Sequence, residues 1–122
     1  MLHSELTEKI IACAYTVYNK MGYGYLESVY EKCMLIELAD VGLNVEAQKR
    51  LKVLYKGQIV GDFVVDVIVN DTVIVELKSV SKIVKAHEIQ LVNYLVSTNK
   101  PVGLILNFGK DKVEVKRKVK EL

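Results

Sequence analysis

Apolar residues recur every three or four positions through the N-terminal third of the chain, which is the spacing of one helical face. The first such stretch runs from Ser4 to about Lys20, with Ser4 as candidate N-cap and Gly22 as candidate stop. A second helix is predicted from about Leu26 to Val41, ended by Gly42. The apolar positions are Leu6, Ile10, Cys13, Ala14, Val17 and Met21 in the first helix, and Leu26, Val29, Tyr30, Cys33, Leu38 and Val41, expected to face inward, in the second.

Beyond Gly42 the period falls to two, which is typical of strands. Residues 45–51 alternate weakly, and the runs Val53–Tyr55 and Gln58–Val69 flank Lys56-Gly57, a hairpin signal. A third strand is predicted from about Val73 to Val80, after a turn at Asn70-Asp71.

The helical period returns from about Lys85 to Thr98, and two further strands are predicted at Val102–Asn107 and Val113–Val119. The late helix is long enough to carry a crossover to a parallel neighbouring strand. The expected fold is therefore α/β (α+β), a mixed sheet flanked by helices with two helices before the sheet.

Composition supports a single domain over residues 1–122, since 51% of the residues are hydrophobic. Charged residues interrupt the most apolar stretch, so no run reaches the roughly 18 residues of a membrane span. Glu5, Glu8 and Lys9 stand where a signal peptide needs an apolar segment, so we expect a cytoplasmic protein without a membrane partner. Cys13 and Cys33 fall at apolar helical positions and are interpreted as reduced core thiols rather than a disulfide or metal site.

The charge balance is close to neutral, with 17 basic and 15 acidic side chains and a net charge of +2. This weakens any claim of strong non-specific binding to nucleic acid, which depends on a basic excess. Two clusters of cations are interpreted as solvated faces. They consist of Lys49, Arg50, Lys52 and Lys56, and of Lys110, Lys112, Lys116, Arg117, Lys118 and Lys120.

Three charged residues interrupt strands that are otherwise rich in Val and Ile: Asp66, Glu76 and Lys78. Glu76 and Lys78 are two residues apart, so their side chains leave the same face. If Val69 pairs with Val73 across a three-residue loop, Asp66 lies directly opposite Glu76. A two-residue loop would send the two carboxylates to opposite faces. A metal site here therefore predicts an odd loop or a bulge.

Two facing carboxylates suit a hard divalent cation, Mg²⁺ or Mn²⁺. Zinc is disfavoured because His and Cys are missing nearby. Lys78 beside the ion would lower the pKa of an attacking water or stabilise charge on a scissile phosphate. The alternative is a structural Asp/Glu/Lys network that braces the sheet edge, and spacing alone does not separate the two.

The order and spacing of several motifs resemble the PD-(D/E)XK nuclease superfamily. Asp66 followed by Glu76-Leu77-Lys78 is similar to the signature that names it, and Gly24-Tyr-Leu-Glu27-Ser-Val-Tyr30 matches the motif of the GxxExxY protein family within it. The resemblance covers nearly the whole chain and includes Tyr55-Lys56-Gly57, Gly103-Leu-Ile-Leu-Asn-Phe108-Gly109, and Gln90-Leu-Val-Asn-Tyr94, which is similar to the QxxxY motif of RecB-type nucleases. It implies a restriction-endonuclease-like core.

The resemblance also implies a catalytic set. Asp66 and Glu76 would ligate the metal together with the backbone carbonyl of Leu77, and Lys78 would be the catalytic lysine. Glu27, on the second helix, corresponds to an acid that binds metal directly or through water. Its alternative role is electrostatic support of the helix N-terminus.

Further residues have more open roles. Gln90 and Tyr94 share a helical face, from which they would orient the lysine or contact the substrate backbone. His87 is expected to be an ordinary helix residue. Val65 stands where the superfamily's name has Pro, and Asp62 is the fallback ligand if the strand is shifted.

Two functions follow as hypotheses. The first is a Mg²⁺- or Mn²⁺-dependent nuclease that hydrolyses phosphodiester bonds, with DNA as the expected nucleic acid. A domain this small would then need a homodimer, a partner protein or low sequence specificity. The second is a non-catalytic module that keeps the nuclease-like fold and binds nucleic acid or protein. A hydrolase of another phosphoester is a weaker third hypothesis.

Overall fold

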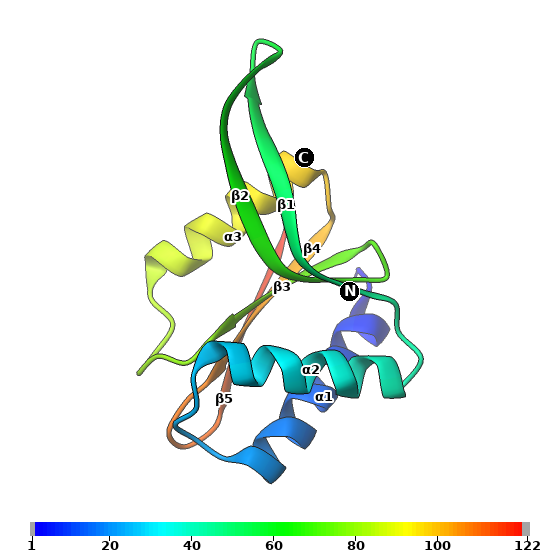
Figure 1. Ribbon diagram of the computed structural model, residues 1–122, viewed down its shortest axis with the longest axis vertical. Coiled ribbons are helices and arrows are strands. Elements are labelled where there is room, and N and C mark those ends of the chain that lie inside the picture. The colour runs from blue at the N-terminus through cyan, green and yellow to red at the C-terminus, as the bar shows by residue number, and fades with distance from the viewer. Residues whose placement is uncertain (1, 121–122) are drawn as a thin grey trace.

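The computed structural model describes residues 2–120, which form three helices and five strands (Figure 1). In chain order these are α1 (Ser4–Met21), α2 (Glu27–Asp40), β1 (Val45–Tyr55), β2 (Gln58–Val69), β3 (Val73–Lys78), α3 (Lys85–Thr98), β4 (Val102–Phe108) and β5 (Val113–Val119). The predicted order of elements is confirmed, with small differences at their ends.

Local sequence signals predicted the C-terminal end of α1 correctly but not its N-cap or the two ends of α2. Gly22 ends α1 with φ 73°, a left-handed conformation that favours glycine. The N-cap of α1 is His3 rather than Ser4, which is the first helical residue. Leu26 and Val41 cap the two ends of α2 and are 76% and 52% exposed, so their predicted inward position is wrong. Both lie outside the helical repeat that sets which face is buried.

The sheet has the order β1-β2-β3-β4-β5. Only β3 and β4 are parallel, and α3 makes the crossover between them. The other neighbouring strands pair antiparallel. The mixed sheet with helices on its faces is thus confirmed.

Each face of the sheet has its own hydrophobic core. Residues such as Val75 and Leu104 pack with α1 and α2 on one face, whereas Ile74 and Ile105 pack with α3 on the other. Successive side chains of β3 and β4 point alternately into the two cores, as expected for central strands covered on two sides. The close approach of α3 requires Gly103 on β4, because a Cβ there would lie 2.6 Å from Cδ1 of Leu91.

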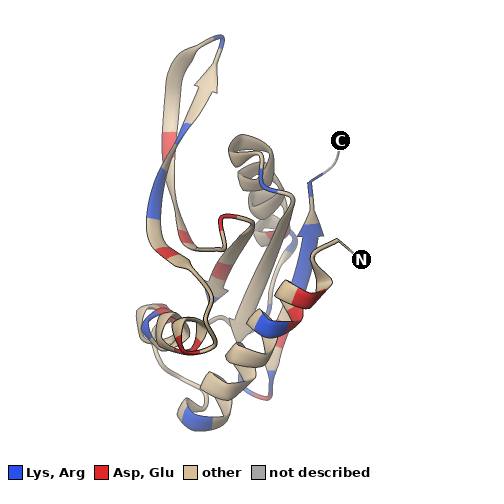
Figure 2. Cartoon of the chain, turned by 90° about the vertical axis from the view of Figure 1, so that its right-hand side faces the viewer, with Lys and Arg blue, Asp and Glu red and all other residues tan. Residues whose placement is uncertain are grey.

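The strands β1 and β2 continue beyond the sheet as a long hairpin that stands clear of the body (Figures 1 and 2). β3 pairs only with Val67, Ile68 and Val69 of β2, so the rest of β2 pairs with β1 alone. The hairpin twists where Gln48 lies opposite Asp66, and Gln48 has φ 52°. The twist turns the strand over. Val67 packs toward α1 and α2, while Val65 packs toward α3.

The state of the two cysteines and the length and polarity of the helices bear on two further expectations. Cys13 and Cys33 are both free thiols, Cys13 buried and Cys33 partly buried, as predicted. Across residues 2–120, each helix is too short or too polar to cross a membrane.

Candidate functional site

The register of β2 and β3 brings two carboxyls together. Val69 pairs with Val73 and Val67 with Val75, so a three-residue turn joins the strands and Asp66 falls opposite Glu76. The odd loop required for a two-carboxylate site is therefore confirmed. Regular pairing stops at Val67, because β2 turns away from β3 at this point.

Hydrogen bonds to the carboxyls continue where the ladder ends. The backbone N–H of Leu77 donates to Oδ2 of Asp66 over 2.8 Å. The backbone N–H of Asp66 donates to Oε1 of Glu76 over 3.4 Å. Each carboxyl is thus held by the backbone of the other strand, which fixes both side chains at the opening between the strands.

The environment of Glu76 disfavours its negative charge. Its residue is 7% exposed, and burial followed by the charge of Asp66 raises the pKa of Glu76 to about 8. The charge of Lys78 acts in the opposite direction and lowers this pKa. At neutral pH the carboxyl pair therefore retains a proton unless further positive charge is supplied.

A cavity of about 280 Å³ opens beside this pair, between α2 and the base of the hairpin. Its lining residues are Glu27, Ser28, Glu31, Gln48, Asp66 and Leu77. Glu27 is the first residue of α2, which places its carboxyl at the positive end of the helix dipole. Glu76 does not line the cavity, because its side chain is buried beside Asp66. The cavity thus brings Asp66 and Leu77 together with the helical acid.

The segment before Glu27 is held by Tyr30, which is completely buried. Its hydroxyl donates to the carbonyl of Gly22 over 2.5 Å and accepts from the N–H of Tyr25 over 3.3 Å. Its ring stacks on Phe108 with centroids 4.2 Å apart. Tyr30 therefore packs against Phe108, and its hydroxyl also holds the segment that leads into Glu27 at the start of α2.

Tyr94 approaches the carboxyl pair from α3. Its ring stacks on Phe63 of β2 with centroids 4.1 Å apart. Burial, and then the charges of Glu76 and Asp66, raise the pKa of Tyr94. Gln90, one turn earlier, is exposed to solvent. Tyr94 is thus close enough for the charges of both carboxyls to affect its pKa.

Two other candidates have structural explanations. Nδ1 of His87 accepts a hydrogen bond from the N–H of Val84 over 3.1 Å and so caps α3, which agrees with its interpretation as an ordinary helix residue. Asp62 lies on the exposed part of the hairpin, 3.3 Å from Nη1 of Arg50. Since the register places Asp66 opposite Glu76, no strand shift brings in Asp62 as a fallback ligand.

Sequence reasoning missed two lining residues that bond to each other. Nε2 of Gln48 donates to Oε1 of Glu31 over 2.5 Å. Glu31 lies one turn after Glu27, so helical spacing could have found it. Nothing in the sequence marks Gln48, because its position depends on the left-handed backbone of a non-glycine residue.

The donor chemistry of the pair fits a hard divalent cation. Two carboxyls and the carbonyl of Leu77 offer only oxygen, the donor atom that Mg²⁺ and Mn²⁺ prefer. Glu27 is not gathered with them into a single ligand group. Among residues 2–120, no three His, Cys, Asp or Glu side chains converge on one point. The residues that fit the ion are therefore Asp66 and Glu76.

The sequence matches a known protein family, and the fold is similar to a solved structure. The family model of the PD-(D/E)XK nuclease superfamily matches residues 4–118. The fold is similar to the crystal structure of SSO0001, with a TM-score of 0.64 and 17% identity, over 98% of this chain and 60% of that chain. This chain thus spans less than two thirds of that protein, and the likeness is one of fold. No curated protein matches the sequence.

Proposed function

Because the chain belongs to the PD-(D/E)XK nuclease superfamily, we propose that it is a metal-dependent nuclease that hydrolyses phosphodiester bonds, with DNA as its nucleic acid. The observation that carries the proposal is the carboxyl pair. Asp66 and Glu76 come from different strands, each carboxyl accepts a hydrogen bond from the backbone of the other strand, and Asp66 lines a cavity. Burying the Glu76 carboxyl beside a second carboxyl lowers stability when both are ionised, which is a cost expected at a functional site.

The proposal assigns Mg²⁺ or Mn²⁺ to Asp66, Glu76 and the carbonyl of Leu77. When bound, the ion would neutralise the carboxyls and polarise a phosphate oxygen. Lys78 lies on the same strand face as Glu76 and would place its ammonium against the charge that develops on the phosphate. Glu27, in the cavity with Asp66, would hold a water or a ligand from the α2 side.

Two residues on α3 are assigned to substrate. Tyr94 would donate its hydroxyl to the substrate backbone or to the carboxyl pair, since its raised pKa keeps the proton on the oxygen at neutral pH. Gln90 lies one turn away on the exposed side of the helix. It would contact the substrate backbone where it leaves the site.

Membership of the GxxExxY family is also part of the proposal. In this chain the glycine-rich segment, Glu27 and Tyr30 act together, because the Tyr30 hydroxyl ties the segment to the helix that carries Glu27. A cytoplasmic location, and a homodimer or partner protein that supplies specificity, complete the proposal.

The test is cleavage by the purified protein with Mg²⁺ or Mn²⁺ present. Linear, circular and single-stranded DNA and RNA are each incubated with wild-type protein and with Asp66→Asn and Lys78→Ala. The matched control is Asp62→Asn, which removes an exposed carboxylate from the same strand. We expect both site variants to lose more than about 100-fold of the activity, as for a lost charge-stabilising group, and the control to cleave like the wild type.

Each outcome separates the hypotheses. Cleavage that survives in both site variants would contradict the proposed site. Binding without cleavage, unchanged in Asp66→Asn and Lys78→Ala, would instead support a non-catalytic binding module. Calorimetric titration with Mg²⁺ supplies an independent measurement, and heat of binding that disappears in Asp66→Asn is the expected result.

A further inference from the structure

The outer part of the hairpin, residues 50–62, which we call the arm, contributes only Leu51 to the hydrophobic cores described above. The last anchoring contact is the stack of Phe63 on Tyr94, with partly buried Leu51 beside it. From Leu51 to Tyr55 the arm extends roughly 13 Å further, at about 3.3 Å per residue. Figures 1 and 2 show it projecting alone from one end of the sheet.

The tip of the arm exposes large apolar side chains. Leu54, Tyr55, Ile59 and Val60 are each between 59% and 64% exposed. The turn between them is well defined, because Lys56 and Gly57 both have positive φ, as a tight hairpin turn requires. A preformed tip with several exposed apolar side chains indicates a contact surface rather than a loose loop.

The arm also accounts for the positive charge of the chain. It carries Arg50, Lys52 and Lys56 against one carboxylate, Asp62. The whole chain has 17 basic and 15 acidic side chains, so the residues outside the arm have 14 of each and no net charge. Arg50 lies 3.3 Å from Asp62, whereas within residues 2–120 no carboxylate lies within 4.0 Å of the Lys52 or Lys56 ammonium.

In the basic cluster at the opposite edge of the sheet, three of the six cations already have a partner. Lys118 pairs with Glu88 over 2.7 Å. Arg117 donates to the carbonyl of Leu2, and Lys120 donates to Oδ1 of Asn99. Lys118, Arg117 and Lys120 are therefore less available to a ligand than Lys52 and Lys56 of the arm.

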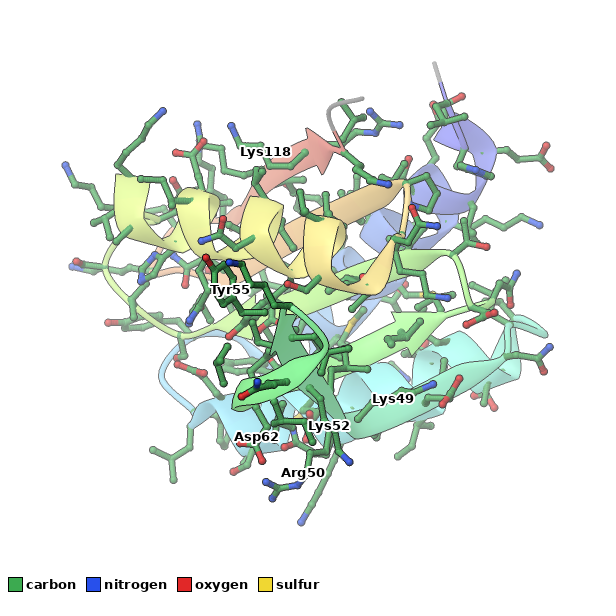
Figure 3. The ribbon with its side chains drawn as sticks, turned by 90° about the horizontal axis from the view of Figure 1, so that it is seen from above. Lys49, Arg50, Lys52, Tyr55, Asp62 and Lys118 are labelled. Atoms are coloured by element: carbon green, nitrogen blue, oxygen red, sulfur yellow. The ribbon has the colours of Figure 1, made fainter. Side chains whose placement is uncertain are left out.

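The basic side of the arm continues the wall of the cavity. Gln48 lines the cavity. Beyond the twist at Gln48, Arg50 and Lys52 occupy alternate exposed positions of β1 and so share one face of the strand. Figure 3 shows Arg50 and Lys52 projecting on the side of α2, with Tyr55 directed toward the α3 side. Alternate residues rise about 6.6 Å, roughly two base-pair steps of DNA.

We propose that the arm binds double-stranded DNA and leads it to the cavity, an inference that rests on the proposed function for the nature of the substrate. Arg50 and Lys52 contact phosphates about two base-pair steps apart, and the apolar tip enters the major groove beside them. A two-stranded ribbon fits the major groove of B-form DNA, whereas the major groove of double-stranded RNA is too narrow to admit it.

The test is DNA binding in EDTA, where the readout does not depend on cleavage. A labelled duplex of about 20 base pairs, two helical turns, is titrated with the full chain and followed by fluorescence anisotropy at several salt concentrations. We expect Arg50→Gln with Lys52→Gln to weaken binding about tenfold and to reduce the salt slope by about 2. Tyr55→Ser is expected to weaken binding about tenfold, the loss of one apolar contact with base edges in the major groove.

The matched control is Lys110→Gln with Lys112→Gln, which removes the same charge from the exposed turn between β4 and β5. We expect this pair to change affinity by less than about twofold and to reduce the salt slope by less than 1. Circular dichroism confirms that every variant is folded. A duplex RNA of the same sequence is expected to bind more weakly than the DNA.

Three results would overturn the arm's role. They are equal losses in the two double variants, no binding of duplex by the wild type, and tip variants that abolish self-association in light scattering while DNA affinity stays unchanged. The last would make a second copy of the chain the partner of the tip. Arm variants that bind normally while Asp66→Asn abolishes cleavage would refute the arm alone. Arm-dependent binding without any cleavage would refute the nuclease alone.

Discussion

The hydroxyl of Tyr30 donates a hydrogen bond to the carbonyl of Gly22 over 2.5 Å, and this contact ties the end of α1 to the second turn of α2. The same hydroxyl accepts from the N–H of Tyr25. One buried oxygen therefore organises the short connection that precedes Glu27. Its effect on stability and on the site can be separated experimentally.

Replacing Tyr30→Phe keeps the ring stacked on Phe108 but leaves the Gly22 carbonyl and the Tyr25 N–H without this partner. We expect the free energy of unfolding in urea to fall by about 1–3 kcal/mol, the cost of leaving partly buried polar groups unpaired. The matched control is Tyr15→Phe, whose hydroxyl donates to Val113 over 3.2 Å from a partly exposed position. A larger loss in the control would contradict the organising role of Tyr30.

Glu76 predicts an unusual dependence of stability on pH. Its pKa is about 8 in the folded protein against an ordinary value of 4.5, so the folded state holds the proton more tightly than the unfolded state. Its contribution to stability is complete below about pH 4.5 and is lost as the pH rises through 8. In this window we expect stability to fall by up to about 1.4 kcal/mol per pH unit relative to Glu76→Gln.

Urea denaturation from pH 5 to 9 of wild type and Glu76→Gln provides this measurement. Asp62→Asn is the control, because Asp62 is exposed, and its curve is expected to follow the wild type. Added Mg²⁺ is expected to restore stability to the wild type above pH 7 and not to Glu76→Gln. Parallel curves for wild type and Glu76→Gln would show that burial does not perturb this carboxyl.

Asn107 fixes the segment that follows Lys78. The buried amide accepts from the N–H of Val80 and donates to its carbonyl, both over 2.9 Å. We expect Asn107→Ala to cost about 2–4 kcal/mol of unfolding free energy and to expose the segment 79–84 to proteolysis. Asn93→Ala, at an exposed position of α3, is the control and should change stability by less than about 0.5 kcal/mol. Resistance to proteolysis equal to that of the control would count against this role.

Gly103 permits the contact of α3 with the sheet. A methyl group there would lie 2.6 Å from Cδ1 and 3.0 Å from Cγ of the buried Leu91, so we expect Gly103→Ala to cost about 1–3 kcal/mol through overpacking. Combining it with Leu91→Val should recover part of this loss, since the two residues contact each other. Gly61→Ala is the control, because no atom lies within 4 Å of the added methyl group. Thermal denaturation of the four proteins measures both effects.

Local patterns were sufficient for most of the fold. Periodicity located all three helices, and Lys56-Gly57 marked the hairpin turn because two residues with positive φ suit that turn. Patterns failed where packing decides. Leu26 and Val41 are apolar and continue the spacing of the buried α2 residues. Both are nevertheless exposed, because α2 extends only from Glu27 to Asp40.

The candidate site was predictable as a set of residues more than as an arrangement. The register argument placed Asp66 opposite Glu76 because strand geometry has a period of two. Gln48 could not be found, since its left-handed backbone arises where the hairpin twists off the sheet. The sequence likewise did not show that Glu27 lines the same cavity as Asp66 without joining the carboxyl pair in one ligand group, because this depends on how α2 packs.

The amino-acid sequence by itself determined the elements, their order and the pairing that makes two carboxyls neighbours. These depend on short-range spacing, turn chemistry and alternation, which act over a few residues. Tertiary structure alone decided that Glu76 is buried while Asp66 faces a cavity, and that Arg50 and Lys52 project on the side of α2 (Figure 3). The reason is that burial and electrostatic coupling depend on which distant surfaces pack together, and no local pattern contains that information.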